Sequence, residues 1–307
     1  MNENNKKLET KRIILYLGIT FALTIAYSFG IIYPFYRKAE TDLLFASLVQ
    51  LVVAGVMFCP SIGVLLTRLI TKEGLQNAWL HPHIKGNIKT YLLAYFGPGI
   101  LTIVGAAIYF LVFPDAFDPN MGYFVYALES SGAGIETLPI SLNVLVAIQF
   151  VQGFLLAPIL NFVTCFGEEW GWRGYLLPKM AKKLPMLPML LVTGIIWGLW
   201  HAPLTAIGHN YGLGYPGFPF TGIATMCLFC TVLGIFLSYI TLKTKSCIPA
   251  VIAHGAVNGI AAIGTLFTKD GGNPFIGPAP SGVVGMIPFM IVAVLMIVFY
   301  FRKQKEI

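Results

Sequence analysis

Eight long apolar runs constrain this 307-residue chain more than any other feature. Most of them approach or exceed the roughly 20 residues that a helix needs to cross a bilayer. Hydrophobic residues make up 57% of the chain and charged residues 11%, whereas a soluble domain carries about 25% charged residues. We therefore expect an all-α, polytopic helical bundle in the cell membrane, built as a single membrane domain over residues 1–307. The expected spans are about 13–35, 43–67, 90–113, 142–166, 187–204, 220–242, 247–267 and 282–301.

The positive charges lie in the short segments between these runs. Seventeen of the 20 Lys and Arg residues fall on the side of the membrane that holds the N-terminus, and three, Arg37, Lys38 and Lys269, fall on the other. Because cytoplasmic loops carry the excess of Lys and Arg, we expect both termini in the cytoplasm. Membrane orientation thus accounts for the net charge of +7, and we expect a surrounding lipid bilayer and no nucleic-acid partner.

Two adjacent carboxylates and an arginine interrupt the apolar sequence after the fourth run. Ionisable groups at membrane depth are costly and usually functional. Glu169 and Arg173 are four residues apart, so they share a helical face and favour a structural ion pair. Glu168 is about 100° round the helix from Glu169 and is left to point into the bundle. A carboxyl in such a low-dielectric site suits general-base chemistry near neutral pH; a second structural carboxylate is the alternative.

Two histidines lie inside later apolar runs. Trp197 and His201 are four residues apart, and so are His254 and Asn258, so each pair shares a helical face. The second pair is spaced to aim two donors at one oxygen, as an oxyanion site requires. Hydrogen bonding between helices is the alternative explanation for these polar groups.

Together, a carboxylate, two histidines and an amide provide the groups needed for water activation. Peptide hydrolysis needs a base to deprotonate water and donors to hold the developing oxyanion. Glu168, His201 and His254 are also the donor types of a catalytic zinc site with one open position. The cofactor is therefore left open between a divalent metal such as zinc and no metal.

Three patterns carry a family resemblance. They are Glu-Glu-x-x-x-Arg-Gly-Tyr-Leu beginning at Glu168, an aromatic-x-x-x-His ending at His201, and His-x-x-x-Asn beginning at His254. In this order they resemble the CPBP family of intramembrane proteases, which includes the type II CAAX prenyl endopeptidases and the bacterial Abi proteins linked to bacteriocin immunity. The second pattern of that family often begins with phenylalanine, and this chain has Trp197 instead. The core that carries the patterns is expected over about 142–267.

The resemblance implies a role for each matching position. Glu168 and His201 would activate the attacking water, and His254 and Asn258 would form the oxyanion hole. The supporting residues would be Glu169 and Arg173. The resemblance admits both a metalloprotease and a metal-independent glutamate mechanism.

We accordingly expect an intramembrane endopeptidase acting near the cytoplasmic membrane face on a peptide or protein, prenylated or otherwise membrane-associated. The substrate stays open between CAAX-type processing and bacteriocin or signal-peptide processing. The alternatives are a non-proteolytic immunity or regulatory scaffold and, further off, a transporter. In straight spans, Glu168 would lie near the cytoplasmic end of the fourth span and His201 roughly 20 Å into the fifth. Tilt, a later start of the fifth span or a membrane-embedded motif helix is needed to bring them to one depth.

Overall fold

The computed structural model describes residues 3–301 except 133, 135 and 137, and its described elements are helices joined by turns and loops. Seven helices in this part of the chain are long and apolar enough to cross a membrane, which confirms the expected multi-pass membrane fold. They are Asn5–Ala39, Leu43–Ile70, Ile88–Val112, Leu142–Leu160, Met186–Ala206, Phe220–Thr244 and Ile248–Phe267. The eighth expected span is a shorter apolar helix, Ile287–Tyr300. Orientation stays a prediction, and Arg302, Lys303 and Lys305, which contribute to it, lie outside the described residues.

The chain divides into two compact units. Unit 1 comprises Met1–Gly86 and Val163–Val251, and unit 2 comprises Asn87–Phe162 and Ile252–Ile307. The helix α14 (Ile248–Ile260) begins in unit 1 and continues into unit 2. The expectation of one membrane domain over residues 1–307 stays a prediction.

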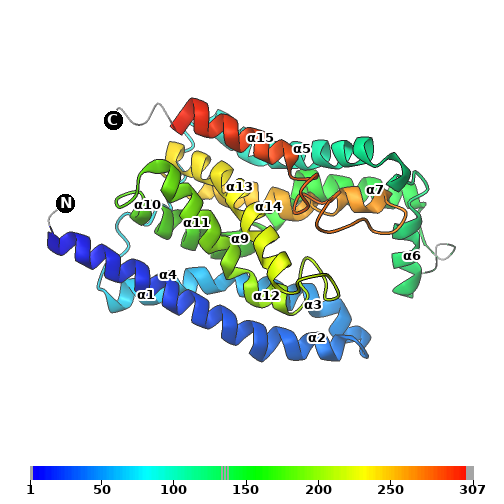
Figure 1. Cartoon of the computed structure of the whole chain (residues 1–307), viewed down its shortest axis with the longest axis horizontal. Coiled ribbons are helices and arrows are strands. Elements are labelled where there is room, and N and C mark those ends of the chain that lie inside the picture. Colours follow the sequence, from blue (N-terminus) through cyan, green and yellow to red (C-terminus); the bar gives the residue numbers. More distant parts are fainter. Residues whose placement is uncertain (1–2, 133, 135, 137, 302–307) are drawn as a thin grey trace. The chain divides into compact units, whose positions relative to one another are not determined.

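Unit 1 contains the segment with the paired carboxylates. Its first helix, α1 (Glu3–Tyr27), continues through η1 (Ser28–Ile32) into α2 (Tyr33–Ala39) as one long rod, blue in Figure 1. The remaining elements are α3 (Leu43–Gly55), η2 (Val56–Phe58), α4 (Cys59–Ile70), α9 (Phe162–Glu169), η6 (Trp170–Leu176), α10 (Leu177–Met180), α11 (Met186–Trp200), α12 (Ala202–Ala206) and α13 (Phe220–Thr244). α1 packs on α4, α4 packs on η6, and α11 packs on α13 along much of its length.

Two glycines let α11 and α13 meet backbone to backbone. A Cβ at Gly194 would lie 2.5 Å from Thr231 Cα, and a Cβ at Gly198 would lie 2.4 Å from Cys227 Cα. Both distances are too short for a side chain, so the close approach requires glycine at both positions. Small residues four apart are a common device for packing helices within a bilayer. This seam fixes the height of α11 against α13, and with it the position of Trp197.

The fourth expected span, 142–166, is shorter in the structure. The apolar helix α7 (Leu142–Val151), η5 (Gln152–Leu156) and α8 (Ala157–Leu160) ends before Asn161, and α9 begins after it. Asparagine favours such a break because its side chain competes for backbone hydrogen bonds, and Asn161 Nδ2 donates to the carbonyl of Gly255 at 3.2 Å. The paired carboxylates therefore belong to a separate motif helix rather than to the end of the span.

Unit 2 contains α14 for most of its length. Its other elements are α5 (Ile88–Val112), η3 (Pro114–Ala116), α6 (Gly122–Ser130), α7, η5, α8, η7 (Ile263–Phe267), α15 (Ile287–Met296) and η8 (Ile297–Phe301). A Cβ at Gly153 in η5 would lie 2.5 Å from the carbonyl oxygen of Gly259, so η5 lies tightly against α14. A small core of Met121, Phe124 and Val146 joins α6 to α7. These contacts support the helix that carries His254 and Asn258.

Candidate active site

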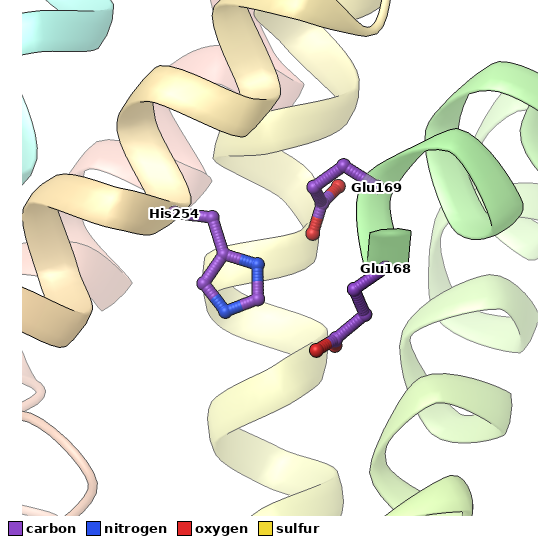
Figure 2. Close-up of side chains that lie close together, drawn as sticks. All are labelled: Glu168, Glu169 and His254. Atoms are coloured by element: carbon purple, nitrogen blue, oxygen red, sulfur yellow. The ribbon is translucent and has the colours of Figure 1, made fainter. Parts of the chain in front are cut away.

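The paired carboxylates lie in a fully buried segment. Every residue from Gly167 to Leu177 is buried, and Glu168 is 2% exposed and Glu169 0%. An ionised carboxylate in such surroundings costs several kcal/mol unless it is paired or hydrogen-bonded. Figure 2 shows the two side chains at the end of α9, together with His254 of α14. The segment turns into the π-helical η6 directly after Glu169, and π-helical turns are frequent at functional sites.

Glu169 forms the ion pair that the sequence spacing predicts. Arg173 Nη1 lies 3.0 Å from Glu169 Oε1, and the two side chains are 4% and 0% exposed. The guanidinium carbon of Arg173 also lies 4.0 Å from the centroid of the Trp197 ring, within the range of a cation–π contact. Gly234 of α13 leaves room for this stack, because a Cβ there would lie 3.3 Å from Arg173 Nη2. Arg173 therefore balances one carboxylate and ties α9 and η6 to α11.

Glu168 meets a different group. The indole Nε1 of Trp197 donates to Glu168 Oε1 at 2.5 Å. A hydrogen bond to an ionised carboxylate is about twice as strong as one between neutral groups. The two adjacent glutamates thus meet different groups, the first an indole N–H and the second a guanidinium, as their different helical faces predict.

The depth mismatch expected from the sequence disappears in unit 1. Trp197 lies about 16 Å along α11 from the first residue of that helix, at 1.5 Å per residue. Because its indole reaches Glu168, the carboxylate lies at that same level of α11, one turn from His201. The separate motif helix after Asn161 makes this arrangement possible.

His201 follows directly after the last residue of α11 and is half-buried. Its Nδ1 lies 2.9 Å from the backbone carbonyl of Trp197. Because a carbonyl oxygen only accepts, Nδ1 must carry the proton, and in a neutral ring Nε2 then holds the lone pair. Pro203 ends α11 here, since it has no N–H and its ring clashes with the carbonyl four residues back. The imidazole is thereby fixed in the tautomer that a base or a metal ligand needs at Nε2.

His254 and Asn258 lie on α14, in unit 2. They are four residues apart, with His254 6% exposed and Asn258 exposed. The carbonyl of Gly255, next to His254, accepts the side-chain amide of Asn161, which holds this turn of α14 against the end of α8. The oxyanion role of the two residues stays a prediction.

Two contacts of unit 1 were not expected from the sequence. The indole N–H of Trp197 reaches Glu168, and Cys230 Sγ lies 3.7 Å from His201 Nδ1. Trp197 belongs to the aromatic-x-x-x-His pattern, so its position is marked in the sequence although its hydrogen bond is not. No sequence pattern identifies Cys230 as a neighbour of His201, because a cysteine in an apolar run is most often a packing residue.

The residues present fit a divalent metal in their chemistry. Carboxylates and a neutral imidazole are zinc ligands, and Glu168, Glu169 and His254 supply such groups. His201 would have Nε2 for a ligand bond, since its Nδ1–H is held by a backbone carbonyl, the usual support of a ligating histidine. The ligand set Glu168, His201 and His254 stays a prediction.

The comparisons with known proteins cover the part of the chain that carries these residues. Residues 150–260 match the family model described as "Type II CAAX prenyl endopeptidase Rce1-like". The CAAX prenyl protease 2 of Methanococcus maripaludis is 33% identical over 112 residues, which are 36% of this chain and 41% of that protein. The chain thus spans about two fifths of the length of the curated relative it matches. Residues 168–258, which hold all three sequence patterns, lie within the matched family region, so this part of the chain is similar to the Rce1-like type II CAAX prenyl endopeptidases.

Proposed function

We propose that the protein is an intramembrane endopeptidase in which Glu168 and His201 activate the attacking water and His254 and Asn258 hold the oxyanion. The observation that carries the proposal is that the two adjacent buried glutamates have different partners. Glu169 is paired with Arg173, whereas Glu168 accepts the neutral N–H of Trp197. A buried carboxylate held by a neutral N–H donor is suited to take a proton from water.

The proposed reaction is direct hydrolysis. Glu168 and His201 remove a proton from water as its oxygen attacks the carbonyl carbon of the scissile peptide bond. The carbonyl π electrons move to the oxygen, and the side-chain N–H groups of His254 and Asn258 stabilise the oxyanion. The C–N bond then breaks, and the proton taken from water passes to the leaving amine. A buried carboxylate, a half-buried imidazole and two donors four residues apart match the needs of these steps.

A divalent metal is the alternative way of activating the water. When bound, zinc would lower the pKa of its water and polarise the carbonyl. Glu168, His201 and His254 would be its ligands. Metal content of active protein, combined with cleavage after chelation, separates the two mechanisms: full activity in metal-free protein contradicts an obligatory zinc.

The substrate proposal follows the family and the name of the relative, a CAAX prenyl protease. We propose a peptide or protein held at the membrane by a prenyl group or by its own apolar segment, and cleaved near the cytoplasmic face. The two classes separate in a paired assay, with one peptide sequence ending in a CAAX box offered farnesylated and unmodified. A bacteriocin-type or signal-type peptide in the same membrane mimic provides the third arm.

The test of the catalytic proposal uses purified protein in lipid nanodiscs. We expect Glu168→Gln and His254→Ala to lower peptide cleavage at least about 100-fold, the scale of losing a general base or an oxyanion donor. Glu40→Gln is the matched control, because Glu40 pairs with Arg37 at the surface, where their side chains are 57% and 63% exposed. Full activity in Glu168→Gln and His254→Ala would contradict the proposal and favour a scaffold or a transporter.

A further inference from the structure

Trp197 contacts three members of the candidate site in unit 1. Its indole N–H donates to Glu168 Oε1 at 2.5 Å. The face of its ring lies 4.0 Å from the guanidinium carbon of Arg173. Its backbone carbonyl accepts the Nδ1–H of His201 at 2.9 Å. One residue, 2% exposed, therefore touches both proposed bases and the cation that neutralises the neighbouring carboxylate.

The hydrogen bond from Trp197 fixes the orientation of the Glu168 carboxylate. An indole N–H can donate but not accept, so the bond holds Oε1 at one point and limits rotation of the carboxylate. The bond is buried, and it is strong when Glu168 is ionised, the form that a base requires. A base must be held within a fraction of an ångström of its productive position, because a displacement of about 1 Å can lower a rate about 100-fold.

The ring and the N–H of Trp197 make separable contributions. A phenylalanine ring at this position would keep an aromatic face for the Arg173 guanidinium. It would have no donor for Glu168. The backbone carbonyl that fixes His201 would remain in either case. Replacing Trp197 by Phe therefore removes one interaction and keeps the other two.

We propose that Trp197 is a positioning residue of the reaction, whose indole N–H holds the Glu168 carboxylate in line with the water that His201 also contacts. The proposal rests on the proposed function. It assigns the hydrogen bond a role in turnover beyond its contribution to folding.

The chain offers a matched control on the same helix. Trp200 is also buried, at 1% exposed, and its Nε1 donates to Thr24 Oγ1 at 2.6 Å. Trp200→Phe thus removes a buried indole hydrogen bond of similar geometry that does not reach a carboxylate, and it keeps an aromatic ring against His201, whose ring centroid lies 4.7 Å from that of Trp200. If the Trp197 bond only supports the fold, the two Phe variants should behave alike.

The experiment compares Trp197→Phe, Trp200→Phe and Glu168→Gln with the unchanged chain in nanodiscs, with kcat and KM measured on a peptide that the unchanged chain cleaves. We expect Trp197→Phe to lower kcat about 10-fold to 100-fold with KM within about two-fold, the pattern of a lost transition-state interaction. Trp200→Phe should leave kcat within about two-fold. Thermal unfolding of each variant shows that it is folded.

A second substitution keeps the test valid if Trp197→Phe does not fold. Site-specific incorporation of 3-benzothienylalanine at position 197 replaces the indole N–H by sulfur and keeps the ring shape. The same fall in kcat is expected. A kcat within two-fold of the unchanged chain in this variant, or a rise in KM alone, would overturn the proposal for Trp197. Loss of cleavage in Glu168→Gln beside such a result would leave the proposed function standing, whereas an active Glu168→Gln would remove both.

Discussion

The guanidinium of Arg173 lies between Glu169 and Trp197, 3.0 Å from the carboxylate oxygen of the first and 4.0 Å from the ring centroid of the second. Arginine suits this position because its planar cation can pair with a carboxylate and stack on an aromatic face at once. The contact joins the end of α9 to the last turn of α11.

Arg173→Met should therefore destabilise unit 1 strongly. Removing the cation leaves Glu169 as a buried charge, and breaking a buried pair in this way costs about 3 to 5 kcal/mol. The measurement is denaturant-induced unfolding in detergent micelles. Arg37→Met, which breaks an exposed pair with Glu40, should change stability by less than about 1 kcal/mol. Equal effects of the two substitutions would contradict the importance of burial.

The buried cation Lys179 should also stabilise unit 1, at a second cluster of charges. Its Nζ lies 3.0 Å from Glu9 Oε2 and 2.5 Å from Glu73 Oε1, and it is 5% exposed. Lys179→Met would remove one cation from two carboxylates that keep Arg12 as a partner, so we expect a loss of about 1 to 3 kcal/mol, below that of a fully unpaired buried charge. The exposed Lys243→Met provides the control. An unchanged unfolding midpoint in Lys179→Met would show that the cluster does not hold α1 and α10 to the end of α4.

Gly198→Ala should lower both stability and kcat. A Cβ at position 198 would lie 2.4 Å from Cys227 Cα, so α11 must move away from α13, at a cost of about 1 to 3 kcal/mol. The displacement would carry Trp197 away from Glu168. Gly18→Ala is the matched control, because a Cβ at Gly18 meets no atom within 4 Å. Its kcat should be unchanged and its stability should not fall, since alanine is favoured over glycine in a helix interior by about 0.5–1 kcal/mol. A normal kcat in Gly198→Ala would show that the seam does not set the geometry of the site.

Cys247 should resist alkylation until the protein unfolds. Burial, with a smaller contribution from the charge of Glu169, raises the pKa of this thiol from 9.0 to about 12. Because the folded state disfavours the thiolate, this contribution to stability is present below pH 9 and is lost as the pH rises towards 12. Iodoacetamide labelling at pH 8, read by mass spectrometry, should modify the half-buried Cys227 well before Cys247. Cys247→Ala should reduce the loss of stability between pH 9 and 12, and rapid labelling of Cys247 in folded protein would contradict its burial.

The sequence predicts the features of this protein that depend on local spacing. Apolar runs of bilayer length predict the spans, because a helix must satisfy its own backbone in lipid. The pair of Glu169 and Arg173 is predicted because four residues return to the same helical face. The expected fourth span, 142–166, is too long, because the residues up to Phe166 continue the apolar run. The break at Asn161 is accompanied by a hydrogen bond to the distant Gly255, which the local sequence does not reveal.

Contacts between distant segments escape prediction from a single sequence. Trp197 reaches Glu168 across 29 positions, and nothing in the spacing says which face of α11 meets α9. The cluster of Glu9, Glu73 and Lys179 joins α1 and α10 to the loop after α4, although these charges look like ordinary loop charges in the sequence. Both arrangements follow from the packing of the helices, which glycines such as Gly194 and Gly198 decide through backbone approach.

The hydrogen bond that fixes His201 has a consequence for the path of a proton. Since Nδ1 already donates to the carbonyl of Trp197, the ring cannot pass a proton from one nitrogen to the other. A proton accepted at Nε2 has to leave from Nε2. In the reaction we propose, the water must therefore enter, and the amine must depart, on the same side of the imidazole.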